Sequence, residues 1–83
     1  MNIKESIRTI LEQNYTIESM MDCFELIKKN GDIIVIKFDG EREKDAYTVF
    51  ITFPPSRNKQ MIRTDSSDLK EAMKIVLEKY IED

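Results

Sequence analysis

The spacing of apolar residues changes twice along this chain, and this change constrains the fold more than any other feature. Up to Gly31 the apolar residues recur every three or four positions, which is typical of amphipathic helices. Between Asp32 and Phe53 lie two short apolar segments, residues 33–38 and 46–53, whose side chains divide by alternation between two faces, which is typical of strands. From Leu69 onward the helical spacing returns. The pattern therefore predicts helices on both sides of a small antiparallel sheet.

The helical segments carry one apolar stripe each. Thr16 is placed to cap the second helix, and Gly31 follows it as a left-handed stop. Ser66-Ser67-Asp68 form an N-cap before the last helix. The expected stripes are Ile3, Ile7, Ile10 and Leu11 in the first helix, Ile17, Met20, Met21, Phe24 and Ile27 in the second, and Leu69, Ala72, Met73, Val76, Leu77 and Tyr80 in the last.

The strands follow one another as a meander. The first spans residues 33–38, a polar hairpin spans 39–45, and the second strand ends before Pro54-Pro55, which cannot donate to a ladder. A shorter third strand is expected over residues 60–64, at an edge. The fold class is therefore α+β, with two N-terminal helices, a three-stranded antiparallel β-meander and a C-terminal helix (ααβββα), the helices packed mainly on one sheet face.

The two faces of the expected sheet are both partly apolar. The core face is expected to carry Ile34, Ile36, Phe38, Tyr47, Val49, Ile51 and Phe53. The outer face still carries Ile33, Val35 and Phe50, which are unlikely to be left in water by chance. Either the first helix covers them or a partner does. Cover by the first helix is the favoured alternative, because a small domain gains stability by burying such residues.

Length and composition describe one small globular domain over residues 1–83. The chain has 41% hydrophobic and 35% charged residues, and its formal net charge of -3 is too small for a general polyanion binder. The start lacks the apolar region of a signal peptide, and the longest aliphatic run, residues 33–36, is far too short to span a membrane. One cysteine offers no intramolecular disulfide. These features predict a cytoplasmic protein.

Several chemistries are closed to this composition. The chain has no His, one Cys and two Gly, so Ser-His and Cys-His dyads, imidazole zinc sites and Gly-rich phosphate loops are excluded. Ser67 and Lys70 match an S-x-x-K pattern, but a serine at this place is what a helix start requires. Cys23 lies in a helical stripe and is expected to be buried and inert. We therefore expect no enzyme, no cofactor and no catalytic or metal-binding residues.

The hairpin has an alternating series of acids that resembles the start of a calcium loop. It consists of Asp39, Glu41, Glu43 and Asp45. The rest of the segment does not match a calcium loop, because Lys44 stands where the turn glycine belongs and Phe50 where the closing glutamate belongs. The series is therefore interpreted as a solvated hairpin. An alternative, in which Asp39 or Glu41 acts with Tyr47 on a small ligand, requires a pocket of a few hundred cubic ångströms.

The order of helix, three-stranded meander and helix from Ile17 onward resembles the double-stranded RNA-binding domain. In that family lysines at the start of the last helix bind phosphates, whereas Asp68 and Glu71 stand in the corresponding place here. Nucleic-acid binding is therefore not expected. The basic stretch around the third strand is interpreted as protection of an edge, with phosphate contact as the weaker alternative; it consists of Arg57, Lys59 and Arg63.

The remaining hypothesis is a small protein-interaction module, such as an adaptor, inhibitor or immunity-type protein. The candidate interface consists of Ile33, Val35, Thr48, Phe50 and Thr52 on the outer sheet face, with Asp39, Glu41, Glu43 and Asp45 as a polar rim. Residues 1–3, Ile7-Arg8, Ile10 and Tyr15-Thr16 resemble the opening of small phage-borne anti-CRISPR inhibitors. The alternatives are self-association into a homodimer and binding of a small ligand by the hairpin carboxylates.

Overall fold

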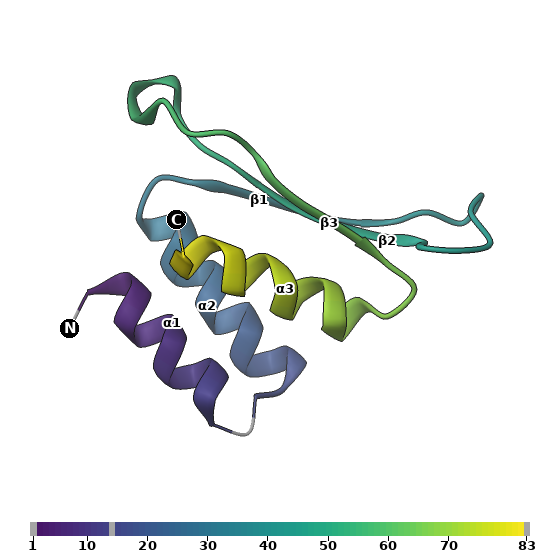
Figure 1. Cartoon of the computed structure of the whole chain (residues 1–83), viewed down its shortest axis with the longest axis horizontal. Coiled ribbons are helices and arrows are strands. Elements are labelled where there is room, and N and C mark those ends of the chain that lie inside the picture. The colour runs from purple at the N-terminus through teal and green to yellow at the C-terminus, as the bar shows by residue number, and fades with distance from the viewer. Residues whose placement is uncertain (1, 14, 83) are drawn as a thin grey trace.

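The computed structural model describes residues 2–13 and 15–82 and shows the predicted ααβββα order (Figure 1). The sheet is antiparallel, with strand order β1-β2-β3, so β2 is central and both β1 and β3 are edges. The elements are α1 (Ile3–Glu12), α2 (Ile17–Lys29), β1 (Ile33–Phe38), β2 (Tyr47–Thr52), the short 3-10 helix η1 (Pro55–Arg57), β3 (Ile62–Ser66) and α3 (Leu69–Glu82).

The start and the end of α2 follow the local signals in the sequence. The Thr16 hydroxyl accepts the N–H of Ser19 at 3.0 Å, and the Ser19 hydroxyl accepts the N–H of Thr16 at 2.8 Å, which completes a capping box. After the helix, Gly31 adopts a φ of +92°, a conformation that side-chain-bearing residues rarely adopt. The predicted cap and the predicted left-handed stop are both confirmed.

β3 lies two residues later than predicted, whereas α3 begins directly after the predicted cap segment, residues 66–68. The strand spans Ile62–Ser66 instead of residues 60–64, because it pairs with β2 from Ile51↔Ile62 to Tyr47↔Ser66. Asp68 directly precedes α3 and caps its start, since its carboxylate accepts the N–H of Lys70 at 3.0 Å. The predicted edge position of β3 is confirmed.

The molecule has three layers, and α1 lies in the outermost one. α3 packs on β2 and β3, and α2 packs on β1. Among the described residues α1 contacts α2 and α3 but no strand, and Figure 1 shows it on the side of these helices away from the sheet. The expectation that the first helix covers the outer sheet face is therefore wrong. The backs of α2 and α3 are themselves apolar, and the stripe of α1 is used to cover them.

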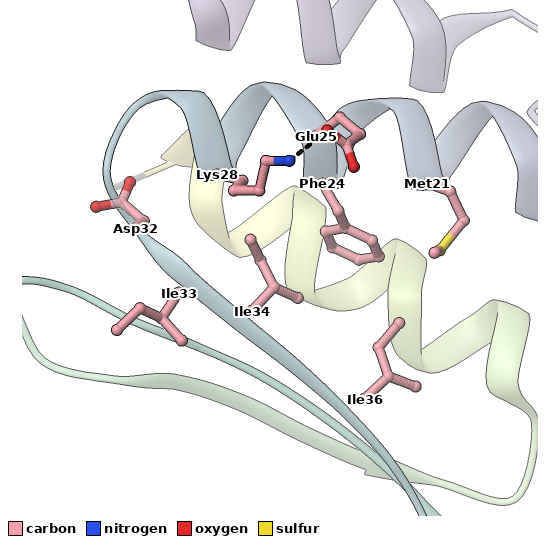
Figure 2. A pocket seen from close by; sticks show the side chains of 8 residues that line it. All are labelled: Met21, Phe24, Glu25, Lys28, Asp32, Ile33, Ile34 and Ile36. Carbon is pink, nitrogen blue, oxygen red and sulfur yellow. Dashed lines mark ion pairs between the residues drawn. The ribbon is translucent and has the colours of Figure 1, made fainter.

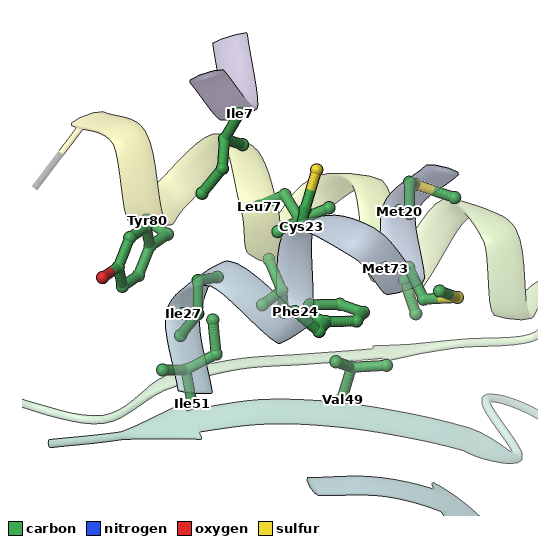
Figure 3. Packing of buried hydrophobic residues seen from close by; sticks show 12 residues of the cluster. Ile7, Met20, Cys23, Phe24, Ile27, Val49, Ile51, Met73, Leu77 and Tyr80 are labelled. Atoms are coloured by element: carbon green, nitrogen blue, oxygen red, sulfur yellow. The ribbon is translucent and has the colours of Figure 1, made fainter. Parts of the chain in front are cut away.

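The core lies between the sheet and α2 and α3, and it continues between these helices and α1. Figure 3 shows Ile7 of α1 pointing toward Cys23 of α2 and Leu77 of α3, and all three are fully buried. The complete set of buried apolar residues in the described chain is Ile7, Met20, Cys23, Phe24, Ile27, Val49, Ile51, Ala72, Met73, Val76, Leu77 and Tyr80.

Three residues assigned to the core by periodicity are instead exposed. Phe38 is 67% exposed because the hairpin end of the sheet extends past the helices, as Figure 1 shows. It contacts Tyr47 edge-to-face, with ring centroids 5.2 Å apart. Ile17 and Met21 are 44% and 46% exposed. Both lie at one flank of the α2 stripe, which the other described elements leave partly exposed.

A buried polar cluster closes the end of the core at the turn between α2 and β1. Tyr80 donates a hydrogen bond to Asp32 at 2.8 Å, and Arg57 Nη1 lies 3.2 Å from each carboxylate oxygen of Asp32. Asn30 donates to the Tyr80 hydroxyl at 3.1 Å, and Arg57 also donates to the carbonyl of Asn30. Burial and the hydrogen bond to Asp32 raise the pKa of Tyr80. The cluster joins the turn, α3 and the loop after β2.

Candidate functional site

The five residues predicted as an interface lie on the outer sheet face, but they differ in exposure. Ile33 and Val35 on β1 are 57% and 38% exposed. Phe50 and Thr52 on β2 are half-buried, and Thr48 is buried. Val35 pairs with Phe50, and Ile33 pairs with Thr52. The apolar surface available to another molecule is therefore concentrated on β1, with Phe50 beside it.

The other half of this face is polar and joins the hairpin to β3. Asp65 on β3 accepts a hydrogen bond of 2.5 Å from Thr48, and it lies 3.2 Å from the guanidinium groups of both Arg63 and Arg42. These hydrogen bonds hold the pKa of Asp65 well below its ordinary value; the bond from Arg63 has the largest effect and the bond from Thr48 the next largest. Thr48 is therefore part of an internal network on this face.

The depressed pKa of Asp65 predicts a specific dependence of stability on pH. An aspartate whose pKa is lowered by folding stabilises the fold above its unfolded pKa, about 3.9, and this contribution is lost as the pH falls toward the folded value. We expect the difference in unfolding free energy between wild type and Asp65→Asn to be constant near neutral pH and to shrink below about pH 4. Urea titrations measure it, with the exposed Glu43→Gln as control. A difference that persists unchanged into strong acid would contradict the assignment.

The four acids of the hairpin do not converge on one point. Asp39 accepts the N–H of Glu41 at 3.1 Å and lies 3.2 Å from Lys37 and 3.3 Å from Arg42. The backbone hydrogen bond and Lys37 lower its pKa. Glu41, Glu43 and Asp45 are exposed. In the residues that the structure describes, no group of three or more His, Cys, Asp or Glu is placed to hold a metal ion.

A small depression at the hairpin end brings Asp39 beside Tyr47. It has a volume of about 200 Å³ and is lined by Phe38, Asp39, Gly40, Ala46 and Tyr47. Asp39 is its one lining acid and already pairs with Lys37 and Arg42. The depression thus brings together two of the residues of the small-ligand alternative, Asp39 and Tyr47, but leaves Glu41 outside.

The three basic residues that could contact phosphates each interact with a different side chain of the protein. Arg57 is held by Asp32 in the buried cluster. The Lys59 ammonium lies 5.5 Å from the centroid of the Phe53 ring, and Arg63 pairs with Asp65. Phosphates would have to compete with these contacts.

A groove between α2 and β1 was not predicted from the sequence. It has a volume of about 420 Å³ and is lined by Met21, Phe24, Glu25, Lys28, Asp32, Ile33, Ile34 and Ile36. Figure 2 shows Met21 and Ile36 toward one end of the groove and Lys28 and Asp32 toward the other. Glu25 and Lys28 form an ion pair of 2.9 Å on its helical wall. The one hint of the groove in the sequence was Met21. It lies at the edge of the apolar stripe of α2, which already has enough apolar residues to face the core without it.

The strand beside this groove is an edge with little protection. β1 begins with four consecutive β-branched aliphatic residues, and Lys37 is its one charged residue. β3 instead alternates charged side chains, Arg63 and Asp65, along its length. Soluble proteins ordinarily blunt an edge strand with charges, prolines or bulges, because its unpaired N–H and C=O groups attract other strands. β1 therefore combines a free backbone edge with apolar side chains on both of its faces.

Cys23 is buried, and its environment predicts an unreactive thiol. The pKa of Cys23 is raised from 9.0 to about 11. Burial is the larger cause, and the nearby negative charge of Asp22 is the smaller one. Two pKa units reduce the thiolate fraction near pH 8 by about 100-fold. We expect an aromatic disulfide reagent to modify the native protein at least about 100 times more slowly than the protein unfolded in urea. Equal rates would show that the thiol is accessible.

Comparisons with known proteins identify no relative: no family model, no curated protein and no solved structure matches this chain. Among the described residues no helix is long and apolar enough to cross a membrane. The functional conclusion therefore depends on the geometry of this chain.

Proposed function

We propose that this chain is a small non-enzymatic protein-interaction module of the cytosol, which binds another protein through β1 and the outer sheet face. The observation that supports this proposal is the exposure of Ile33 and Val35 on an edge strand that α1 does not cover. Burying such residues against a partner contributes about 25 cal/mol for each Å² of apolar area removed from water.

The arrangement of charges around β1 is consistent with this role. The apolar centre, Ile33, Val35 and Phe50, is bordered on one side by the network of Thr48, Asp65 and its two arginines. Protein interfaces commonly have an apolar centre and a polar rim that sets orientation. Asp39 joins this network through Arg42, whereas Glu41, Glu43 and Asp45 of the hairpin are exposed and are available to steer a basic partner.

Affinity capture from lysate of the source organism tests the proposal. The tagged wild type is compared with the double variant Ile33→Glu, Val35→Glu and with Met61→Glu, a control at a residue that is 50% exposed and directly precedes β3, at the opposite edge of the sheet. We expect one stoichiometric protein that survives nuclease treatment, is lost at least about 10-fold with the double variant and is retained with the control. Thermal melts establish that both variants are folded.

Two results would contradict the proposal. Equal recovery of the partner by the double variant would remove β1 and the outer face from the interface. Recovery that disappears after nuclease treatment, and with Lys59→Glu, Arg63→Glu, which leaves the Arg57–Asp32 contact in place, would indicate a nucleic-acid partner instead.

A further inference from the structure

The free edge of β1 and the groove beside it form one continuous surface. The backbone of α2 lies nearest to β1 among the three strands, so the helix stands toward this edge of the sheet, while Phe24 and Ile27 reach inward to the core. Met21 and Phe24 line the groove from the helix, and Ile34 and Ile36 line it from β1 (Figure 2). The outward edge of β1 pairs with no strand of the described chain. The floor of the groove thus adjoins backbone groups that are free to hydrogen-bond.

Apolar side chains lie on both faces of this edge strand. Ile34 and Ile36 face the groove, whereas Val35 lies on the outer face and Ile33 is exposed at the start of the strand. An extended segment paired with β1 projects alternate side chains to opposite faces of the sheet. Such a segment would cover the apolar side chains on both faces of β1 and would also hydrogen-bond to its free N–H and C=O groups. A folded partner that docks on one face of the sheet would cover that face only.

A second copy of this chain would occupy the edge differently. Pairing β1 with β1 of another copy would place a second α2 on the same face of the sheet, across the joined edge, and two packed helices need about 8–10 Å between their axes. A single extended segment brings no helix with it, so it needs only the spacing of neighbouring strands, about 4.8 Å, beside β1.

The charges on α2 indicate which kind of side chain is favoured at one end of that segment. Glu18 and Asp22 lie in the first two turns of the helix, are exposed and form no ion pair with another described residue. This is the half of the helix that carries Met21, and the nearest base on the helix, Lys28, pairs with Glu25 toward the other end. A cationic side chain in the segment is therefore favoured near the start of α2.

From this geometry we infer that the β1–α2 groove binds an extended apolar segment of a partner protein as a fourth strand, with a lysine or arginine at the end beside Glu18 and Asp22. This inference rests on the proposed function and specifies its partner. Main-chain hydrogen bonds to β1 supply affinity, and the groove admits alternate apolar side chains.

Fluorescence anisotropy with synthetic peptides tests the inference. The probe is a short labelled peptide of alternating valine and threonine with lysine at one end. Its controls carry glutamate in place of lysine, or N-methyl groups on the backbone amides that face one side, which prevent strand pairing. We expect binding that weakens at least about 10-fold on N-methylation and about 5-fold with glutamate at low salt.

Protein variants locate the binding site. Met21→Gln is expected to weaken binding of the lysine probe at least about 10-fold, because it places an amide without hydrogen-bond partners in the apolar groove and adds no charge beside Glu18 and Asp22. Met61→Gln is the matched control and should leave the affinity unchanged. Glu18→Lys combined with Asp22→Lys should reverse the preference for lysine over glutamate in the probe.

Each alternative result overturns the inference. No binding at millimolar probe, equal binding of the N-methylated peptide, or equal binding by Met21→Gln would exclude strand addition in this groove. Self-association that is lost with Met21→Gln would show that a second copy occupies it. If the captured partner is lost with Ile33→Glu, Val35→Glu but fully retained with Met21→Gln, the proposed function stands and the groove is not the site. If no partner is captured at all, the proposed function fails as well.

Discussion

Replacing Asp32 by alanine is expected to lower the free energy of unfolding by about 3 kcal/mol. The Asp32 side chain is fully buried, and it accepts from Tyr80 at 2.8 Å and from Arg57 at 3.2 Å. Its removal leaves the Tyr80 hydroxyl and part of the Arg57 guanidinium without their acceptor in a site that water reaches poorly. Urea denaturation at neutral pH measures the change.

Two comparisons make this prediction specific. Asp22→Ala, at an exposed acid of α2, should change stability by no more than about 0.5 kcal/mol. Tyr80→Phe should cost about 1 kcal/mol alone and much less in the Asp32→Ala background, since its partner is then absent. A loss below about 0.5 kcal/mol for Asp32→Ala would show that the buried cluster contributes little to folding.

Replacing Ile7 by alanine is expected to cost about 3 kcal/mol, because Ile7 is the one fully buried side chain of the described part of α1. The cavity would open between α1, α2 and α3, where Figure 3 shows the side chain. In a domain of this size the loss corresponds to a fall in Tm of roughly 15 °C. Calorimetry and hydrogen exchange measure the two effects, and the α1 amides should lose protection before those of the sheet.

The control for Ile7 is Ile17→Ala, which removes the same atoms at a position that is 44% exposed. We expect a cost below about 1 kcal/mol there. Equal costs at the two positions, or loss of protection in β1 ahead of α1, would contradict the placement of α1 over the helices.

The elements of the fold could be predicted because their signals are local. The spacing of apolar residues, the Thr16 cap and Gly31 each act within a few residues, and the structure confirms them. The exposure of Phe38 could not be predicted in this way, because it depends on how far the sheet extends past helices that are distant in sequence. Periodicity identifies a strand face but does not say how much of that face is covered.

The candidate surface required the tertiary structure for the same reason. Ile33, Val35 and Phe50 were correctly placed on one face by alternation, but their cover depended on where α1 packs. The groove depends on α2 standing over an edge strand, which no local pattern specifies. The cluster around Asp32 joins residues 25 and 48 positions apart, so composition gave no sign of it.

Amide hydrogen exchange with and without the captured partner tests most directly whether β1 is the contact strand. Backbone pairing and exclusion of water both slow exchange, so the method measures directly whether the amides of β1 become protected. We predict that the partner increases protection across Ile33–Phe38 and along the face of α2 that lines the groove, with little change in β3. Protection confined to the hairpin at residues 39–45, or to residues 57–63, would contradict binding through β1.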